Sequence, residues 1–159
     1  MGLISYYRNS IAKTILFWLA LFLYLLSLLS ISIISPQSGD ELRGYEILLY
    51  GGIQTFLGLV SFNLLSALPW LGNIVMLLTF IFIYSNQSKK VSIYLALFGL
   101  VCTLSFLYSP YVMLGPDLRL IEVDVNTGTY LWFFSSLILL CTSLFIQEML
   151  SIKFEVQQK

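Results

Sequence analysis

An uncharged run in the first half of the chain constrains the fold more than any other feature. No Asp, Glu, Lys or Arg occurs from Ile47 to Ser88, between Glu46 and Lys89. As one helix, at about 1.5 Å per residue, this run would be roughly twice as long as the ~30 Å hydrocarbon core of a bilayer. It is also interrupted by the pair Gly51-Gly52 and by Pro69, a residue that breaks helices. How this run is divided therefore decides the topology of the whole chain.

The composition places the chain in a membrane. Of the 159 residues, 58% are hydrophobic and 10% are charged, whereas soluble domains carry about 25% charged residues. A water-soluble fold of this size cannot hide so much apolar surface, so the excess is expected to face lipid. Eight basic and eight acidic residues give no net charge, which argues against nucleic-acid binding. We predict one integral membrane domain over residues 1–159.

The uncharged runs predict four transmembrane helices, because each reaches the roughly 20 residues that a bilayer requires. The expected spans are about 14–34, 68–85, 91–109 and 130–148. Lys and Arg are most frequent in the head, in the turn at Lys89 and Lys90, and in the tail. The positive-inside rule places these three segments in the cytoplasm. Both termini are therefore predicted to be cytoplasmic.

This orientation requires an odd number of crossings between Glu46 and Lys89. We therefore expect one true span near Pro69–Tyr84 and a helix at about 45–66 that stays in the outer leaflet or re-enters it. The alternative is one strongly tilted helix that continues through Pro69. The sequence alone leaves open whether residues 45–66 cross the membrane.

The polar segment 110–129 is predicted to form a small β-hairpin-like outer loop. Apolar and polar residues alternate from Leu118 to Val125, which is typical of a half-buried strand. A turn signal follows at residues 126–128, and residues 129–132 are expected to supply the returning strand. The expected fold class is thus an all-α membrane protein with four spans, one non-crossing helix and this outer loop.

Seven polar residues are candidates for a structural or functional role. They are Glu46, Asn63, Asn73, Arg119, Glu122, Asp124 and Glu148. Glu46 is interpreted as an acid at a helix start, with a proton- or cation-linked site as the alternative. An unpaired amide in hydrocarbon is costly, so Asn63 and Asn73 are expected to clamp other helices or irregular backbone.

The outer-loop charges favour a solvated face. Glu122 and Asp124 share one side of the predicted strand, near Arg119, while their apolar neighbours share the other. A cation site or an acid–base pair is the alternative for these carboxylates. Glu148 is expected to reach the inner interface near Lys13 or Lys153, with a buried proton relay as the alternative.

Several kinds of chemistry lack their residues. The chain has no His, and Cys102 and Cys141 lie in apolar runs, where a Cys is expected to be a packing residue. No phosphate-binding loop, dinucleotide motif or nucleophile elbow occurs. We therefore predict no catalytic residue, metal or cofactor. Aromatic residues near the predicted span ends, Trp18, Trp132 and several Tyr among them, are interpreted as an interfacial belt.

Three short motifs lie between residues 38 and 136. They are the Gly-rich acidic segment Ser38–Glu46, the pair Trp70 and Asn73 at the start of a span, and Gly128–Trp132 at the start of the last helix. In these motifs the chain resembles a group of small multi-span bacterial membrane proteins of unassigned function, although Gly72 stands where that group is expected to have Ala. The resemblance implies the bacterial inner membrane and no activity.

The sequence favours a non-enzymatic interaction protein. The small size and the structured outer loop suggest an accessory or immunity-type protein that recognises another membrane protein or a toxin. Its expected partners are the lipid bilayer and a protein in or at the outer face of the membrane, with a second copy of the chain as a further candidate. The broken helix near Pro69 favours the alternative, a small oligomeric transporter or channel.

Overall fold

The computed structural model describes residues 2–36, 39–49, 51–52, 64–85, 89–114 and 119–157. These residues are mostly helical. The elements in chain order are α1 (Gly2–Leu29), β1 (Ile31–Ile34), β2 (Glu41–Arg43), α3 (Leu64–Tyr84), α4 (Lys89–Tyr108), β3 (Tyr111–Leu114), β4 (Arg119–Glu122), β5 (Asp124–Val125) and α5 (Thr127–Gln157). Residues 44–49 and 51–52 are also helical.

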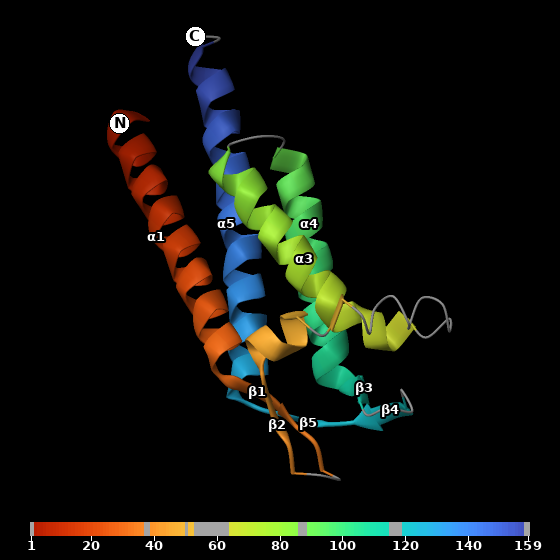
Figure 1. Ribbon diagram of the computed structural model, residues 1–159. Coiled ribbons are helices and arrows are strands. Elements are labelled where there is room, and N and C mark those ends of the chain that lie inside the picture. The colour runs from red at the N-terminus through yellow and green to blue at the C-terminus, as the bar shows by residue number, and fades with distance from the viewer. Residues whose placement is uncertain are drawn as a thin grey trace.

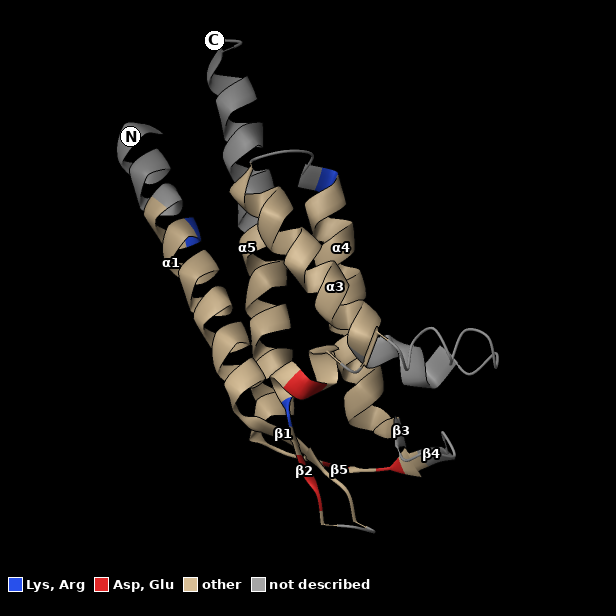
Figure 2. Ribbon diagram, in the orientation of Figure 1, with Lys and Arg blue, Asp and Glu red and all other residues tan. Residues whose placement is uncertain are grey.

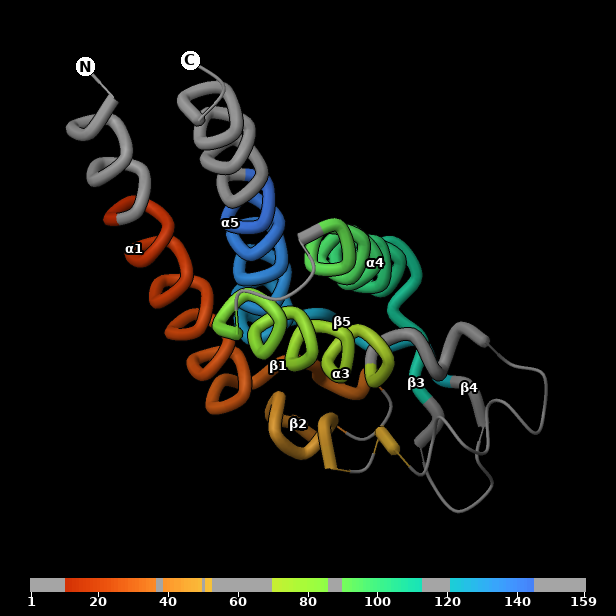
Figure 3. Tube along the Cα trace, turned by 90° about the horizontal axis from the view of Figure 1, so that it is seen from above, coloured from red at the N-terminus to blue at the C-terminus, as the bar shows by residue number. Residues whose placement is uncertain are grey.

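The long helices run side by side, with both termini at one end of the bundle and all the labelled strands at the other (Figure 1). Seen from above, α5 lies between α1 and α4, and α3 lies beside α4 (Figure 3). We call the two ends the strand end and the terminal end. Residues 44–49 lie at the strand end, and α3 runs from there to the terminal end (Figure 1). The described part of the uncharged run therefore contributes one long helix to the bundle.

Within the described ranges, three helical segments are long and apolar enough to cross a membrane: Ile11–Leu29, Lys90–Tyr108 and Thr127–Leu144. They indicate a membrane-embedded protein. The apolar part of α3, Trp70–Tyr84, is shorter. Large apolar side chains such as Phe98, 46% exposed on α4, cover the outside of the bundle, as expected of a surface that faces lipid.

The first predicted span is too long at its carboxyl end. Helix α1 ends at Leu29, and the Ile-Ser-Ile-Ile segment that follows forms β1 instead of a last helical turn. Branching at Cβ favours extended backbone over helix, and β1 has a strand partner on each side. The chain therefore leaves the helix at Leu29, five residues before the predicted end of the span at residue 34.

Helix α3 continues through Pro69, so the break expected there is wrong. The structure nevertheless excludes one continuous helix over the whole uncharged run. Such a helix would hold Leu48 and Trp70 about 33 Å apart, yet the indole Nε1 of Trp70 donates a hydrogen bond to the Leu48 carbonyl at 3.1 Å. The predicted outer helix at 45–66 is correct for its first turns, whereas residues 53–63 lie outside the described part. Its expected end at 66 is wrong, because α3 already begins at Leu64.

Two small antiparallel sheets form the strand end. In one, β1 is central and pairs with β2 and β5, and in the other β3 pairs with β4. The strand predicted between Leu118 and Val125 is confirmed for the described residues as β4 and β5. Its expected partner is wrong, because residues 129–132 belong to α5. Strand pairing to β1 and β3 satisfies the backbone of the outer loop instead.

Candidate functional site at the strand end

The strand end gathers acidic side chains from segments far apart in the sequence. Its described acids are Asp40, Glu41, Glu46, Glu122 and Asp124, which we call the acidic cap. Arg43 lies among them, whereas the described Lys13 and Lys90 lie toward the terminal end (Figure 2). All of the acids except Glu46 are exposed. The two ends of the bundle thus carry opposite charge among the described side chains.

An irregularity in β1 ties the sheet to the start of α5. The pairing of β1 with β2 shifts register between Ile31 and Ile33, where Ser32 is the extra residue. The Ser32 carbonyl accepts hydrogen bonds from the Asn126 backbone N–H at 2.8 Å and from the Thr129 hydroxyl at 2.7 Å. Asn126 directly precedes α5, and its Oδ1 accepts hydrogen bonds from the Thr127 N–H at 2.7 Å and from the Thr127 hydroxyl at 3.2 Å.

Two glycines allow this close approach of segments. A Cβ on Gly44 would strike the Ser27 carbonyl oxygen and would lie 2.8 Å from the Leu28 Cα. A Cβ on Gly128 would strike the Ser32 hydroxyl. Both glycines belong to the motifs found in the sequence, and the structure gives each a packing reason.

Glu46 stabilises the start of the helix at residues 44–49. Its Oε2 accepts a hydrogen bond from the Arg43 backbone N–H at 2.7 Å, and its Oε1 accepts from the Tyr45 hydroxyl at 3.4 Å. A carboxylate at the third helical position that reaches back to the residue before the helix is the arrangement of a capping box. This contact is a sufficient reason for an acid at position 46, so neither a bound cation nor a transferred proton is needed to explain it.

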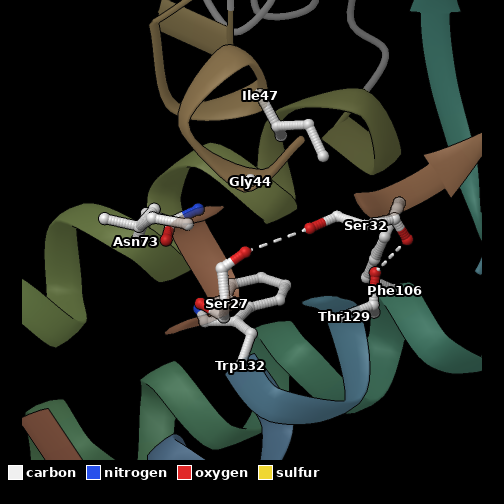
Figure 4. A pocket seen from close by; sticks show the side chains of 9 residues that line it. Ser27, Ser32, Gly44, Ile47, Asn73, Phe106, Thr129 and Trp132 are labelled. Atoms are coloured by element: carbon white, nitrogen blue, oxygen red, sulfur yellow. Dashed lines mark hydrogen bonds between the residues drawn. The ribbon is translucent and has the colours of Figure 1, made fainter. Parts of the chain in front are cut away.

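A small pocket lies directly beneath the cap, where α1, β1, the helix at residues 44–49, α3, α4 and α5 meet (Figure 4). Its polar lining comes from Ser27, Ser32, Asn73, Thr129 and Trp132, all of them buried. The Ser32 hydroxyl donates to the Ser27 carbonyl at 3.5 Å, as the dashed line in Figure 4 shows. The cavity volume is about 20 Å³, which is room for roughly one water molecule.

Trp132 lines this pocket, whereas the sequence analysis placed it in the interfacial belt. Its side chain is 6% exposed, so it does not belong to the interfacial belt. Its ring carbon Cζ2 lies against Gly72, and its ring contacts Phe106 edge-on at a centroid distance of 6.4 Å. Its buried Nε1 has no hydrogen-bond partner among the described residues. By contrast Trp18 is 58% exposed, and its place in the belt stays a prediction.

The sequence analysis also missed the hydroxyl residues of α5. Thr129, Ser135, Ser136, Thr142 and Ser143 are all buried. The Ser135 hydroxyl donates to the Ala20 carbonyl of α1 at 2.8 Å, and the Ser136 hydroxyl donates to the Met76 sulfur of α3 at 3.1 Å. Small hydroxyl residues let helices approach closely and bond across the interface. Thr129, Ser136 and Ser143 recur every seven residues along α5, as do Ser135 and Thr142, and this heptad spacing was the available signal.

The remaining candidate residues are only partly brought together. Glu122 and Asp124 are exposed on either side of buried Val123, which confirms the predicted alternation. They belong to different sheets, since Glu122 pairs with Tyr111 in β3 and Asp124 with Ile34 in β1. Asn73 lies buried in the pocket below, separate from the carboxylates.

Three candidates fall wholly or partly outside the described residues. Asn63 lies within the undescribed segment 53–63. Arg119 is described as part of the β4 backbone and Glu148 as part of α5, but their side chains are outside the description. The predicted pairing of Glu148 with Lys13 or Lys153 therefore stays a prediction.

Among the described residues, no three His, Cys, Asp or Glu side chains come close enough to hold a metal ion. Comparisons with protein-family models, with curated proteins and with solved structures gave no match. Fold and site together define a class, a small helical protein with three candidate membrane spans and an acidic, sheet-bearing end. The acidic cap presents negative charge at fixed positions.

Proposed function

We propose that the protein is a non-enzymatic, multi-pass membrane protein whose acidic cap recognises another protein. The observation that carries this proposal is the acidic cap itself, in which the exposed carboxylates of Glu41, Glu122 and Asp124 lie on paired strands and that of Asp40 directly precedes β2. Paired strands and a tightly packed junction fix the position of these charges before any partner arrives. A preorganised charged surface guides encounter and selects among partners.

The proposed partner carries a basic surface and is itself a membrane protein or an incoming toxin. This makes the chain an accessory or immunity-type protein. In this proposal the strand end faces the outside of a bacterial inner membrane and both termini face the cytoplasm. The positive-inside rule supports this orientation, because Lys90 lies at the terminal end (Figure 2). Helix α3 then crosses the membrane in addition to the three candidate spans, and residues 44–49 stay on the outer side.

The alternative, a small oligomeric transporter or channel, receives less support. The junction pocket beneath the cap, at about 20 Å³, has room for roughly one water molecule. Asn73 lines this pocket together with serine and threonine hydroxyls, which suits a role in holding the segments together. Solute flux into liposomes that is abolished by Asn73→Leu, with the fold retained, would favour the transporter instead.

The test is capture of the partner at native expression after extraction in mild detergent. The wild-type chain and a Lys90→Gln control are expected to retain the same partner. A cap variant with Glu41→Gln, Glu122→Gln and Asp124→Asn is expected to lose it, most clearly at low salt, because exposed charge pairs are screened by salt. Recovery of this chain alone, or equal recovery by the cap variant, would contradict the proposal.

A further inference from the structure

A second and larger pocket lies at the terminal end, between α1 and α3. It is lined by Lys13, Thr14, Phe17, Trp18, Ile83 and Tyr84, and its cavity volume is about 190 Å³. The helices meet here through side chains, with the Phe17 and Tyr84 rings 6.5 Å apart and the Phe17 and Phe80 rings 5.7 Å apart. This contact through rings leaves room between the two helices.

The lining of this pocket combines one cation with hydroxyls and aromatic walls. Lys13 supplies a half-buried ammonium group, Thr14 and Tyr84 supply hydroxyl groups, and the other lining residues are apolar. Lys13 interacts within the chain, and its ammonium group, with its positive charge and up to three donors, is of the kind that binds anionic oxygen groups. Such a lining suits a ligand with an anionic oxygen group on an apolar body.

The position of the pocket favours a ligand that comes from the lipid bilayer. Its residues Ile83 and Tyr84 belong to the last turn of α3, so the pocket lies near the end of the bundle. Its outer wall is open, since Trp18 is 58% and Tyr84 77% exposed. The same side of α1 exposes Ile15 and Phe22, each more than half exposed, as a lipid-facing surface does. Trp and Tyr rings prefer the headgroup level of a bilayer.

We propose that this pocket binds the headgroup phosphate of an anionic phospholipid, with its phosphodiester beside Lys13 and its acyl chains along the exposed face of α1. Lysine binds phosphate as a compact point charge. Lys13 and Lys90, the described charged side chains toward this end, are both positive, which favours an anionic over a zwitterionic lipid. The site lies at the opposite end from the acidic cap and does not depend on partner recognition there.

The test is competitive lipid retention by the full chain. The protein is purified in mild detergent with equal amounts of phosphatidylglycerol and phosphatidylcholine, and bound lipids are counted by native mass spectrometry. Wild type is expected to retain phosphatidylglycerol selectively. Lys13→Gln is expected to lower that retention about fivefold, the usual effect of one lysine near an anionic headgroup. Lys13→Arg should preserve it, because the charge is kept.

Controls separate this site from general surface charge and from a free anion. Lys90→Gln removes an exposed lysine outside the pocket and is expected to leave retention unchanged. Thr14→Phe keeps Lys13 but fills the pocket, and it should lower retention even if Lys13→Gln proves too unstable to purify. Equal losses in Lys13→Gln and Lys90→Gln, retention unaffected by Thr14→Phe, or displacement of the lipid by 10 mM inorganic phosphate would each overturn the proposal.

Discussion

The two ends of the bundle are held together in different ways. At the strand end, the helix at residues 44–49 lies against the end of α1, and the start of α5 lies against β1. The pocket among these segments has a volume of about 20 Å³. At the terminal end, α1 and α3 meet through aromatic rings around a pocket of about 190 Å³. Backbone contact fixes a charged surface in place, whereas contact through side chains leaves space for a ligand.

The largest expected difference between the ends comes from removing one aromatic ring at each. Trp132→Ala should lower the free energy of unfolding by about 3–5 kcal/mol, because a buried indole leaves a cavity that the surrounding backbone cannot close. Tyr84→Ala removes a ring that is 77% exposed and should cost less than about 1 kcal/mol. Unfolding in dodecyl sulfate, followed by circular dichroism, measures both. Equal losses of unfolding free energy in the two variants would contradict the proposed difference between the two ends.

A single added methyl group tests the backbone contact at the strand end. Gly44→Ala should destabilise the protein by about 1–3 kcal/mol, because the new Cβ meets main-chain atoms of Ser27 and Leu28, which cannot rotate away. Gly99→Ala is the matched control in α4. Its Cβ would meet only side-chain atoms at 3.5 Å or more, and the better helix propensity of Ala should make this variant neutral or slightly more stable. A Gly44→Ala variant with unchanged stability would mean that the helix at residues 44–49 does not lie against α1.

The smallest expected effect distinguishes Glu46, the cap acid that stabilises a helix start, from the exposed cap acids. Glu46→Ala removes the acceptor of the Arg43 N–H and should cost about 1 kcal/mol. Glu122→Ala removes an exposed carboxylate of β4 and should change the stability by less than about 0.5 kcal/mol. The same unfolding titration ranks the two variants. If Glu122→Ala proved the more damaging, Glu122 would have a structural role that its exposure does not reveal.

The local periodicity of the sequence predicted the elements, but not always their partners. Hydropathy located the long helices, and alternation from Leu118 to Val125 located β4 and β5. The pairing was wrong because β1 comes from Ile31–Ile34, which reads equally as the end of an apolar helix. A strand of four residues between a helix and a proline has too little pattern to be separated from that helix.

The candidate site was predicted where the residues are charged and missed where they are not. Glu46, Glu122 and Asp124 stood out because charges are rare in this chain. Ser27, Ser32 and Trp132 did not, since serine is ordinary in a membrane helix and tryptophan near a span end suggests the interface. Their burial depends on which segments meet at the junction, and that follows from the strand pairing that the sequence did not reveal.

The account depends most on the two ends facing opposite sides of a membrane. Single cysteines replacing exposed residues test this directly when intact cells are treated with a membrane-impermeant maleimide. Glu41→Cys, in the acidic cap, should react from outside, and Lys90→Cys, toward the terminal end, should react only after the membrane is opened. Tyr94→Cys, 69% exposed on the apolar side of α4, is the lipid-facing control and should resist labelling in both conditions. Labelling of Glu41→Cys and Lys90→Cys from the same side would contradict the account.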